Sequence, residues 1–192
     1  MAVRLSTLLC FMAAAIIQLP EAQSRTTTPT RYDAARELRE RFDQKYYLMQ
    51  RSQVTDRKMG NNAKCVSVLK LAPFPFENSI TAQISIQQNT ARDPRDNIEV
   101  KMTAYTPNPN PIKNMIRITK ETTAELLYNQ KLVFSDHISC RVLTYEYQGD
   151  TYCQLWLIYS AVRGSIPRGC SDAYDQYCQT KHTIFHAQCL PN

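Results

Sequence analysis

The segment Ser79–Gln87, with the sequence SITAQISIQ, decides the fold class. Its apolar residues stand at every second position: Ile80, Ala82, Ile84 and Ile86. Successive side chains of a strand point to opposite faces, so this alternation predicts a strand with one buried face. The next apolar segment repeats the pattern with Ile98, Val100, Met102 and Ala104, after turn residues at Asp93–Asp96. The two segments therefore predict antiparallel strands.

Strand-like segments also make up most of the remaining chain. They are Tyr46–Arg51, Cys65–Leu71, Met115–Thr119, Leu132–Phe134, Ile138–Tyr147, Tyr152–Tyr159 and Thr183–Cys189. Between two of them, Gln148-Gly149-Asp150 predicts a tight hairpin, because Gly149 can adopt the positive φ that such turns need. Helical spacing is found only in Arg31–Gln44 and Cys170–Gln179. Some seven or eight antiparallel strands without intervening helices indicate a sandwich or a closed barrel, and the helices at both ends of the chain favour the barrel. We predict an all-β protein, an eight-stranded antiparallel barrel with an N-terminal helix and a C-terminal helix.

The first 24 residues predict a secretory signal peptide. Arg4 precedes an unbroken apolar run from Leu8 to Ile17, which is half the length that a membrane span needs. We therefore expect a secreted domain of residues 25–192 without membrane insertion. One of the seven cysteines, Cys10, leaves with the signal. The other six predict three disulfides, and spacing alone leaves their connectivity open.

Several functional classes lack the residues that they require. Four glycines in 192 residues offer no glycine-rich phosphate cradle. No nucleophile motif is present, and we expect the protein not to be an enzyme and to need no cofactor. His182 and His186 fall in a strand-like segment, so no metal site is expected. The chain has no clustered basic stripe, so we expect no nucleic-acid partner.

Motifs in both halves of the chain carry a resemblance to a known family. Its residues are Tyr46-Tyr47-Leu48, Asp56, Gly60, Lys64-Cys65-Val66, Cys140-Arg141-Val142, Gln154-Leu155-Trp156, Cys170, Cys178 and Cys189. Together they resemble the tick salivary lipocalins, the histamine-binding protein family. The resemblance implies a lipocalin barrel, secretion in saliva and a part in evasion of the host immune response. It also implies three disulfides: Cys65 with Cys189, Cys140 with Cys170, and Cys153 with Cys178.

The resemblance places a ligand site inside the barrel, and the residues there decide its chemistry. The amine binders of the family carry Asp and Glu where this chain has Arg141 and Gln154. Asp56 and Glu99 are the acids that remain as candidates for facing the interior. A like charge about 4 Å from a bound cation costs roughly 4 kcal/mol at an effective dielectric near 20. The residues therefore disfavour histamine and other biogenic amines, although the family binds them.

A buried guanidinium among apolar and aromatic residues favours an acidic ligand instead. Arginine presents a planar fork of donors that matches a carboxylate. We predict a binding site for a lipid-type ligand, a fatty acid, eicosanoid or sterol, formed by Tyr47, Asp56, Glu99, Arg141, Gln154 and Trp156. Alternation places Tyr47, Met49 and Arg51 on one face. Two other interpretations stay open: Arg141 faces outward, or the barrel is filled by its own side chains.

A second hypothesis assigns the function to the outer surface. A host-protein-binding immunomodulator would engage a host immune protein through loops such as Leu71–Phe76, with the sequence LAPFPF. The net charge of +6 indicates either solubility or attraction to anionic surfaces such as glycosaminoglycans. In both hypotheses we expect a monomer.

Overall fold

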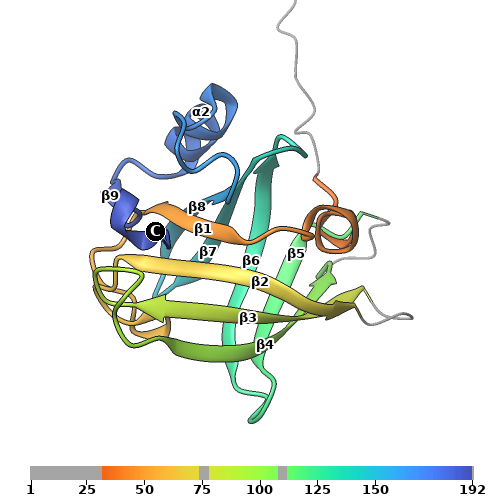
Figure 1. Ribbon diagram of the computed structural model, residues 1–192. Helices are drawn as coiled ribbons and strands as arrows, with labels where there is room; N and C mark the ends of the chain where they lie inside the picture. Colours follow the sequence, from red (N-terminus) through yellow and green to blue (C-terminus); the bar gives the residue numbers. More distant parts are fainter. Residues whose placement is uncertain (1–31, 74–77, 108–111, 192) are drawn as a thin grey trace, which may run out of the picture. The chain divides into compact units, whose positions relative to one another are not determined.

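A closed antiparallel barrel of eight strands is the central feature of the computed structural model (Figure 1). The structure describes residues 32–73, 78–107 and 112–191. The predicted signal peptide, residues 1–24, lies outside the described residues, as do residues 74–76 of the apolar loop. Within the described part, no helix is both long and apolar enough to cross a membrane.

Each strand of the barrel pairs with its neighbour in sequence, and the first strand closes the ring. The strands are β1 (Tyr46–Arg51), β2 (Cys65–Pro73), β3 (Ser79–Gln87), β4 (Asp96–Tyr105), β5 (Met115–Lys120), β6 (Leu126–Ser135), β7 (Cys140–Tyr147) and β8 (Asp150–Ile158). β1 pairs with both β8 and β2, and the short β9 (His182–Thr183) extends the sheet beside β1. The predicted barrel is confirmed.

The interior of the barrel is built by the alternation that the sequence displays. On β3 and β4 the inward residues pair in register, Ile80 with Met102 and Ala82 with Val100. Both pairs belong to the main buried cluster. At the turn between β7 and β8, Gly149 has φ 90°. The predicted hairpin is therefore confirmed.

Helical turns cover one end of the barrel. α1 (Ala34–Arg36) begins at Asp33, whose carboxylate accepts hydrogen bonds from the first-turn N–H groups, and continues into the π-helical segment η1 (Glu37–Arg41). Leu38 and Phe42 pack into the barrel interior. This end lies where β1 begins (Figure 1).

The second helix, α2 (Arg168–Tyr177), packs outside the barrel against β7 and β8 (Figure 1). Its buried side chains, Cys170 and Tyr174, join an outer hydrophobic cluster that is separate from the barrel interior. The helix confirms the prediction for residues 170–179, with both ends shifted by two residues. Two disulfides hold it, Cys140–Cys170 and Cys153–Cys178.

The third disulfide joins Cys65 on β2 to Cys189 near the C-terminus, so all three pairs are those that the resemblance implies. This bridge also explains why the predicted closing strand 183–189 is wrong. The segment pairs with β1 only over β9, and it then crosses to β2 through the 3-10 turn η3 (Ala187–Cys189). The predicted strand Leu132–Phe134 is part of the longer β6.

Candidate functional site: the polar interior of the barrel

Arg141 lies inside the barrel, at the end covered by the helical turns. It is the second residue of β7 and is 1% exposed. Its guanidinium carbon is 4.1 Å from the ring centroid of Phe42 and 4.0 Å from that of Tyr46. These two centroids are only 5.2 Å apart, so both rings support the guanidinium from the same side. The prediction that Arg141 faces inward is confirmed.

The polar atoms of this guanidinium are incompletely satisfied. Among the described residues, neither Nε nor Nη1 of Arg141 has a hydrogen-bond partner. Burial lowers the pKa of Arg141, while Tyr46 and Glu37 act in the opposite direction. Burial also raises the pKa of Tyr46 to about 12, against the charge of Arg141. A buried cation without full pairing lowers the stability of the fold. An anion bound beside Arg141 would offset this cost.

Gln154 and Trp156 lie beside Arg141 on the inward face of β8. Trp156 is the register partner of Arg141, and Gln154 is the partner of Leu143. The Oε1 of Gln154 accepts hydrogen bonds from Gln130 Nε2 at 2.8 Å and from Trp156 Nε1 at 3.2 Å. Its own Nε2 has no partner among the described residues, although Gln154 is 0% exposed. A second buried donor without a partner in the described residues therefore lies on the neighbouring strand, two positions from the register partner of Arg141.

A narrow cavity runs between these polar groups and the apolar strands opposite. It is lined by Met59, Val68, Ile84, Met102, Ile118, Gln130, Arg141, Leu143 and Trp156. Its empty volume is ≈ 240 Å³, of which ≈ 10 Å³ admits the centre of a water molecule. The barrel is thus almost filled by its own side chains. Two of these, Met59 and Met102, are unbranched and can repack at low cost.

Glu37 is a site residue that the sequence interpretation missed. Its carboxylate is 1% exposed and accepts a hydrogen bond from Ser135 Oγ at 2.9 Å, while Oε1 has no partner among the described residues. His137 Nδ1 is 3.7 Å away. The signal was present, because Glu37 follows buried Ala34 by three positions and so shares its helical face.

Asp56 lies at the opposite end of the barrel and does not face Arg141. Its Oδ2 accepts hydrogen bonds from the hydroxyls of Tyr128, at 2.7 Å, and Tyr145, at 3.3 Å. Its Oδ1 accepts from the backbone N–H of Lys58 at 3.0 Å, at the start of the 3-10 turn η2 (Arg57–Met59). Burial, followed by the charge of Asp56, raises the pKa of both tyrosines. Asp56 therefore organises this end of the barrel.

Arg51 is the cation that accompanies Asp56. Its guanidinium is buried and donates to the carbonyls of Gln53, Val54 and Asn61. Burial lowers its pKa, and Asp56 opposes that shift. Arg51 and Arg141 thus lie at different ends of the interior, and Asp56, an acid that the sequence offered for the interior, accompanies Arg51.

A wider recess opens at this end, with ≈ 260 Å³ available to the centre of a water molecule. Its walls include Tyr128, Tyr145 and Tyr147, an aromatic surface that suits a cation. A cation is already there: Lys58 Nζ lies 5.0 Å from the Tyr128 ring centroid and 5.9 Å from that of Tyr147. The same ammonium donates a hydrogen bond to the carbonyl of Leu127.

Two predicted site residues lie outside the barrel. Tyr47 packs against Phe185, with ring centroids 5.4 Å apart, in the outer cluster. The predicted shared face of Tyr47 and Arg51 is wrong, because the β1–β8 register shifts between Leu48 and Gln50 and returns Arg51 to the interior. Glu99 is exposed on β4, between the inward positions. Neither side chain contributes to the interior cavity.

Comparison with known proteins supports the same fold. A sequence profile described as tick histamine binding protein matches residues 23–191. No individual characterised protein matches by sequence at a significant level. Japanin from Rhipicephalus appendiculatus, in a structure bound to cholesterol, aligns with a TM-score of 0.55 at 15% identity, covering 74% of this chain and 91% of japanin. H1 crustacyanin from the lobster Homarus americanus aligns at 0.52 and 12% identity, covering 78% and 80%.

Proposed function

Because the chain belongs to the tick histamine-binding protein family, we propose that it is a secreted carrier that sequesters an acidic lipid in its barrel. Fatty acids and eicosanoids are the ligands that this proposal favours, and the carrier would remove such a mediator from the host to suppress defence. Residues 25–192 would form the mature domain after cleavage of a signal peptide at residues 1–24. The proposed role is stoichiometric binding and not catalysis.

One observation carries the proposal: the fully buried guanidinium of Arg141 lies at a cavity wall, and two of its nitrogens, Nε and Nη1, have no partner among the described residues. A ligand carboxylate would accept hydrogen bonds from both nitrogens and neutralise the charge. Gln154 Nε2, which also has no partner in the described residues, would supply a further donor. The hydrocarbon tail would then lie along the apolar strands β2 to β5. Japanin, bound to cholesterol, is an example of a lipid held in this fold.

The interior of the barrel is almost filled, so a ligand must displace some of its side chains. A tail needs more room than ≈ 10 Å³, so side chains have to move on binding. Met59 is the best candidate, since it belongs to the short turn η2 at the wide recess and not to a strand. We propose that its thioether side chain swings out as the ligand enters from that end with its carboxylate first.

Replacing Arg141 by methionine is expected to weaken the binding of arachidonate by about 100-fold, or about 2.8 kcal/mol. The change removes the charged partner of the ligand carboxylate in this proposal and retains a similar side-chain length. Binding is measured by titration of Trp156 fluorescence, since the indole lies 6.0 Å from the guanidinium carbon.

Arg117→Met is the matched control. Arg117 also covers an aromatic ring, that of Tyr105 at 4.9 Å, but it lies exposed on β5. The control should bind arachidonate as the unmodified protein does. Equal binding by all three proteins, or no binding of any fatty acid or eicosanoid by the unmodified protein, would contradict the proposal.

Biogenic amines are a second candidate ligand, because the tyrosine-lined recess suits a cation. Lys58 lies in that recess, so we expect amines to bind weakly. Its ammonium occupies the tyrosine-lined recess that an amine would use and repels a second cation there. Lys58→Ala is therefore expected to raise the affinity for histamine by about tenfold, whereas Lys58→Arg, which retains the charge, should not. Isothermal titration calorimetry measures both. Tight histamine binding by the unmodified protein would refute this interpretation of Lys58.

A further inference from the structure

An outer recess of the barrel contains two cations, Lys45 and Arg95, that form no ion pair with the described acids. Lys45 precedes β1 and Arg95 precedes β4, and both line the recess together with Tyr47, Ser67 and Gln87. About 80 Å³ is available there to the centre of a water molecule. Because one water requires about 10–15 Å³ on this measure, the recess can hold several waters or one polyatomic ion.

Neither cation is neutralised within the described part of the chain, where no ion pair involves Lys45 or Arg95. Lys45 is half-buried and its Nζ lies 5.9 Å from the ring centroid of Tyr47. Burial lowers the pKa of Lys45, and the charge of Arg95 lowers it further. The two positive charges therefore oppose each other across a partly dehydrated space.

Three acids lie close to these cations along the chain: Asp43, Asp93 and Asp96. Within the described part of the chain, Asp43 and Asp96 form no ion pair with either cation. Asp93 is engaged in its own turn. Its Oδ2 accepts the backbone N–H groups of Asn89 and Thr90, and its Oδ1 accepts the Thr90 hydroxyl at 3.0 Å. The side chain of Gln87 fixes the same turn by donating to the carbonyls of Ala91 and Asp93. These bonds hold the start of β4 without using either cation.

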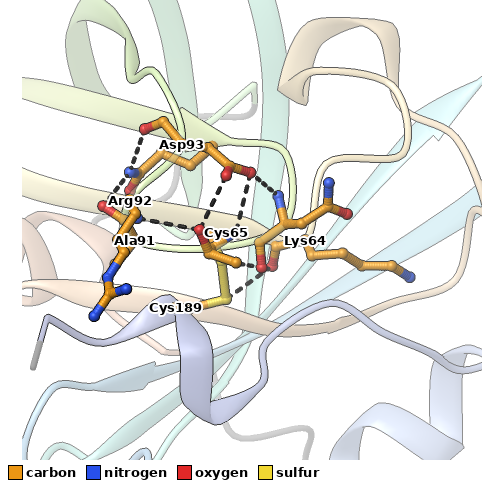
Figure 2. Close-up of a disulfide and its surroundings, with 9 residues drawn as sticks. Lys64, Cys65, Ala91, Arg92, Asp93 and Cys189 are labelled. Carbon is orange, nitrogen blue, oxygen red and sulfur yellow. Dashed lines mark hydrogen bonds between the residues drawn. A yellow bond between two sulfur atoms is a disulfide. The ribbon is translucent and has the colours of Figure 1, made fainter.

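A disulfide makes the opposite wall rigid. Figure 2 shows Cys65–Cys189 beneath the turn that contains Ala91 and Asp93, with Lys64 beside it. The backbone N–H of Ala91 donates to the carbonyl of Gln188 at 2.8 Å, which ties the turn to the C-terminal segment. Covalent and hydrogen-bonded contacts therefore hold the backbone walls of the recess, and the exposed side chain of Arg95 lies at its rim.

We propose that this recess is a binding site for a tetrahedral oxyanion, a sulfate or phosphate ester group, held between Lys45 and Arg95. The anion would neutralise both cations, and the guanidinium of Arg95 and the hydroxyl of Ser67 would donate hydrogen bonds to it. The site lies on the outer surface and is independent of the acidic-lipid site inside the barrel. It would allow the loaded carrier to remain attached to sulfated or phosphorylated material.

The acylation rate of Lys45 tests the site directly. The purified protein is treated with an N-hydroxysuccinimide acetate reagent, and modification of each lysine is followed by peptide mass spectrometry. The probes are sodium sulfate, N-acetylglucosamine 6-sulfate and glucose 6-phosphate, which have no amine that reacts with the reagent, each compared with sodium chloride at equal ionic strength. At about ten times the dissociation constant of a probe, acylation of Lys45 should be slowed about tenfold. Exposed Lys131 should react unchanged.

Two variants separate the recess from general surface charge. Arg95→Gln should abolish the protection of Lys45, and Arg168→Gln, which removes the same charge at a 94% exposed position of α2, should preserve it. Protection by either sugar ester supports the site, and the stronger of the two identifies the source of the oxyanion. Equal protection by chloride, equal protection in Arg95→Gln, or no protection by any probe overturns the proposal.

Discussion

The double variant Glu37→Gln with Arg141→Met is expected to be more stable than the unmodified protein by about 1–4 kcal/mol, and to have lost the binding of acidic lipids. Both charges are fully buried, and each has polar atoms without a partner in the described chain. Replacing such a pair by neutral groups of similar size removes the desolvation cost of two buried charges. Little favourable interaction is lost, because the charges are incompletely paired. Glutamine retains an acceptor for the Ser135 hydroxyl, so that hydrogen bond survives.

The single variants complete a double-mutant cycle. Arg141→Met alone leaves the Glu37 carboxylate without its nearest buried cation, and it should be less stable than the double variant. Urea unfolding, with the m-value checked for constancy, gives the four free energies. A double variant less stable than the unmodified protein would mean that the pair contributes to stability, and that Arg141 has a structural role sufficient to explain its burial.

Removal of the Cys65–Cys189 bridge is expected to have the largest effect on stability. The bridge closes 124 residues of chain, for which the loop-entropy model gives about 5 kcal/mol. This exceeds the value of about 3.5 kcal/mol that the same model gives for Cys153–Cys178, with a separation of 25 residues. Cys65→Ala with Cys189→Ala also frees the C-terminal segment that forms one wall of the outer recess.

Urea unfolding of the two paired-alanine variants measures the difference directly. The Cys153 and Cys178 variant is the control, since it retains the same number of remaining disulfides. Equal losses for the two variants would contradict the entropic account and would indicate that local packing around each bridge decides its contribution. Protection of Lys45 by sulfate should also be lost only in the variant without Cys65–Cys189.

Much of the fold followed from the period of the apolar residues. Strict alternation at Ile80, Ala82, Ile84 and Ile86 identified β3 and its inward face before any contact was known. Alternation could not say which face of β1 points inward, because the outer face is also buried, under Phe185 and the C-terminal segment. Hydrophobicity therefore could not show that Tyr46 faces inward and Tyr47 outward. No sequence pattern predicted the register shift that places Arg51 inside.

For the candidate site, too, the sequence predicted one part and only the tertiary structure decided the rest. The sequence by itself determined that a guanidinium, an amide and an indole, of Arg141, Gln154 and Trp156, occupy alternate positions of two neighbouring strands. That inference is local, since residues two apart in a strand must share a face. Only the tertiary structure decided their partners. Glu37, more than a hundred residues before Arg141, became its buried counter-charge, and Asp56 was assigned to Arg51. Charges interact through space and not along the chain, so barrel closure and packing of the helical end had to be known first.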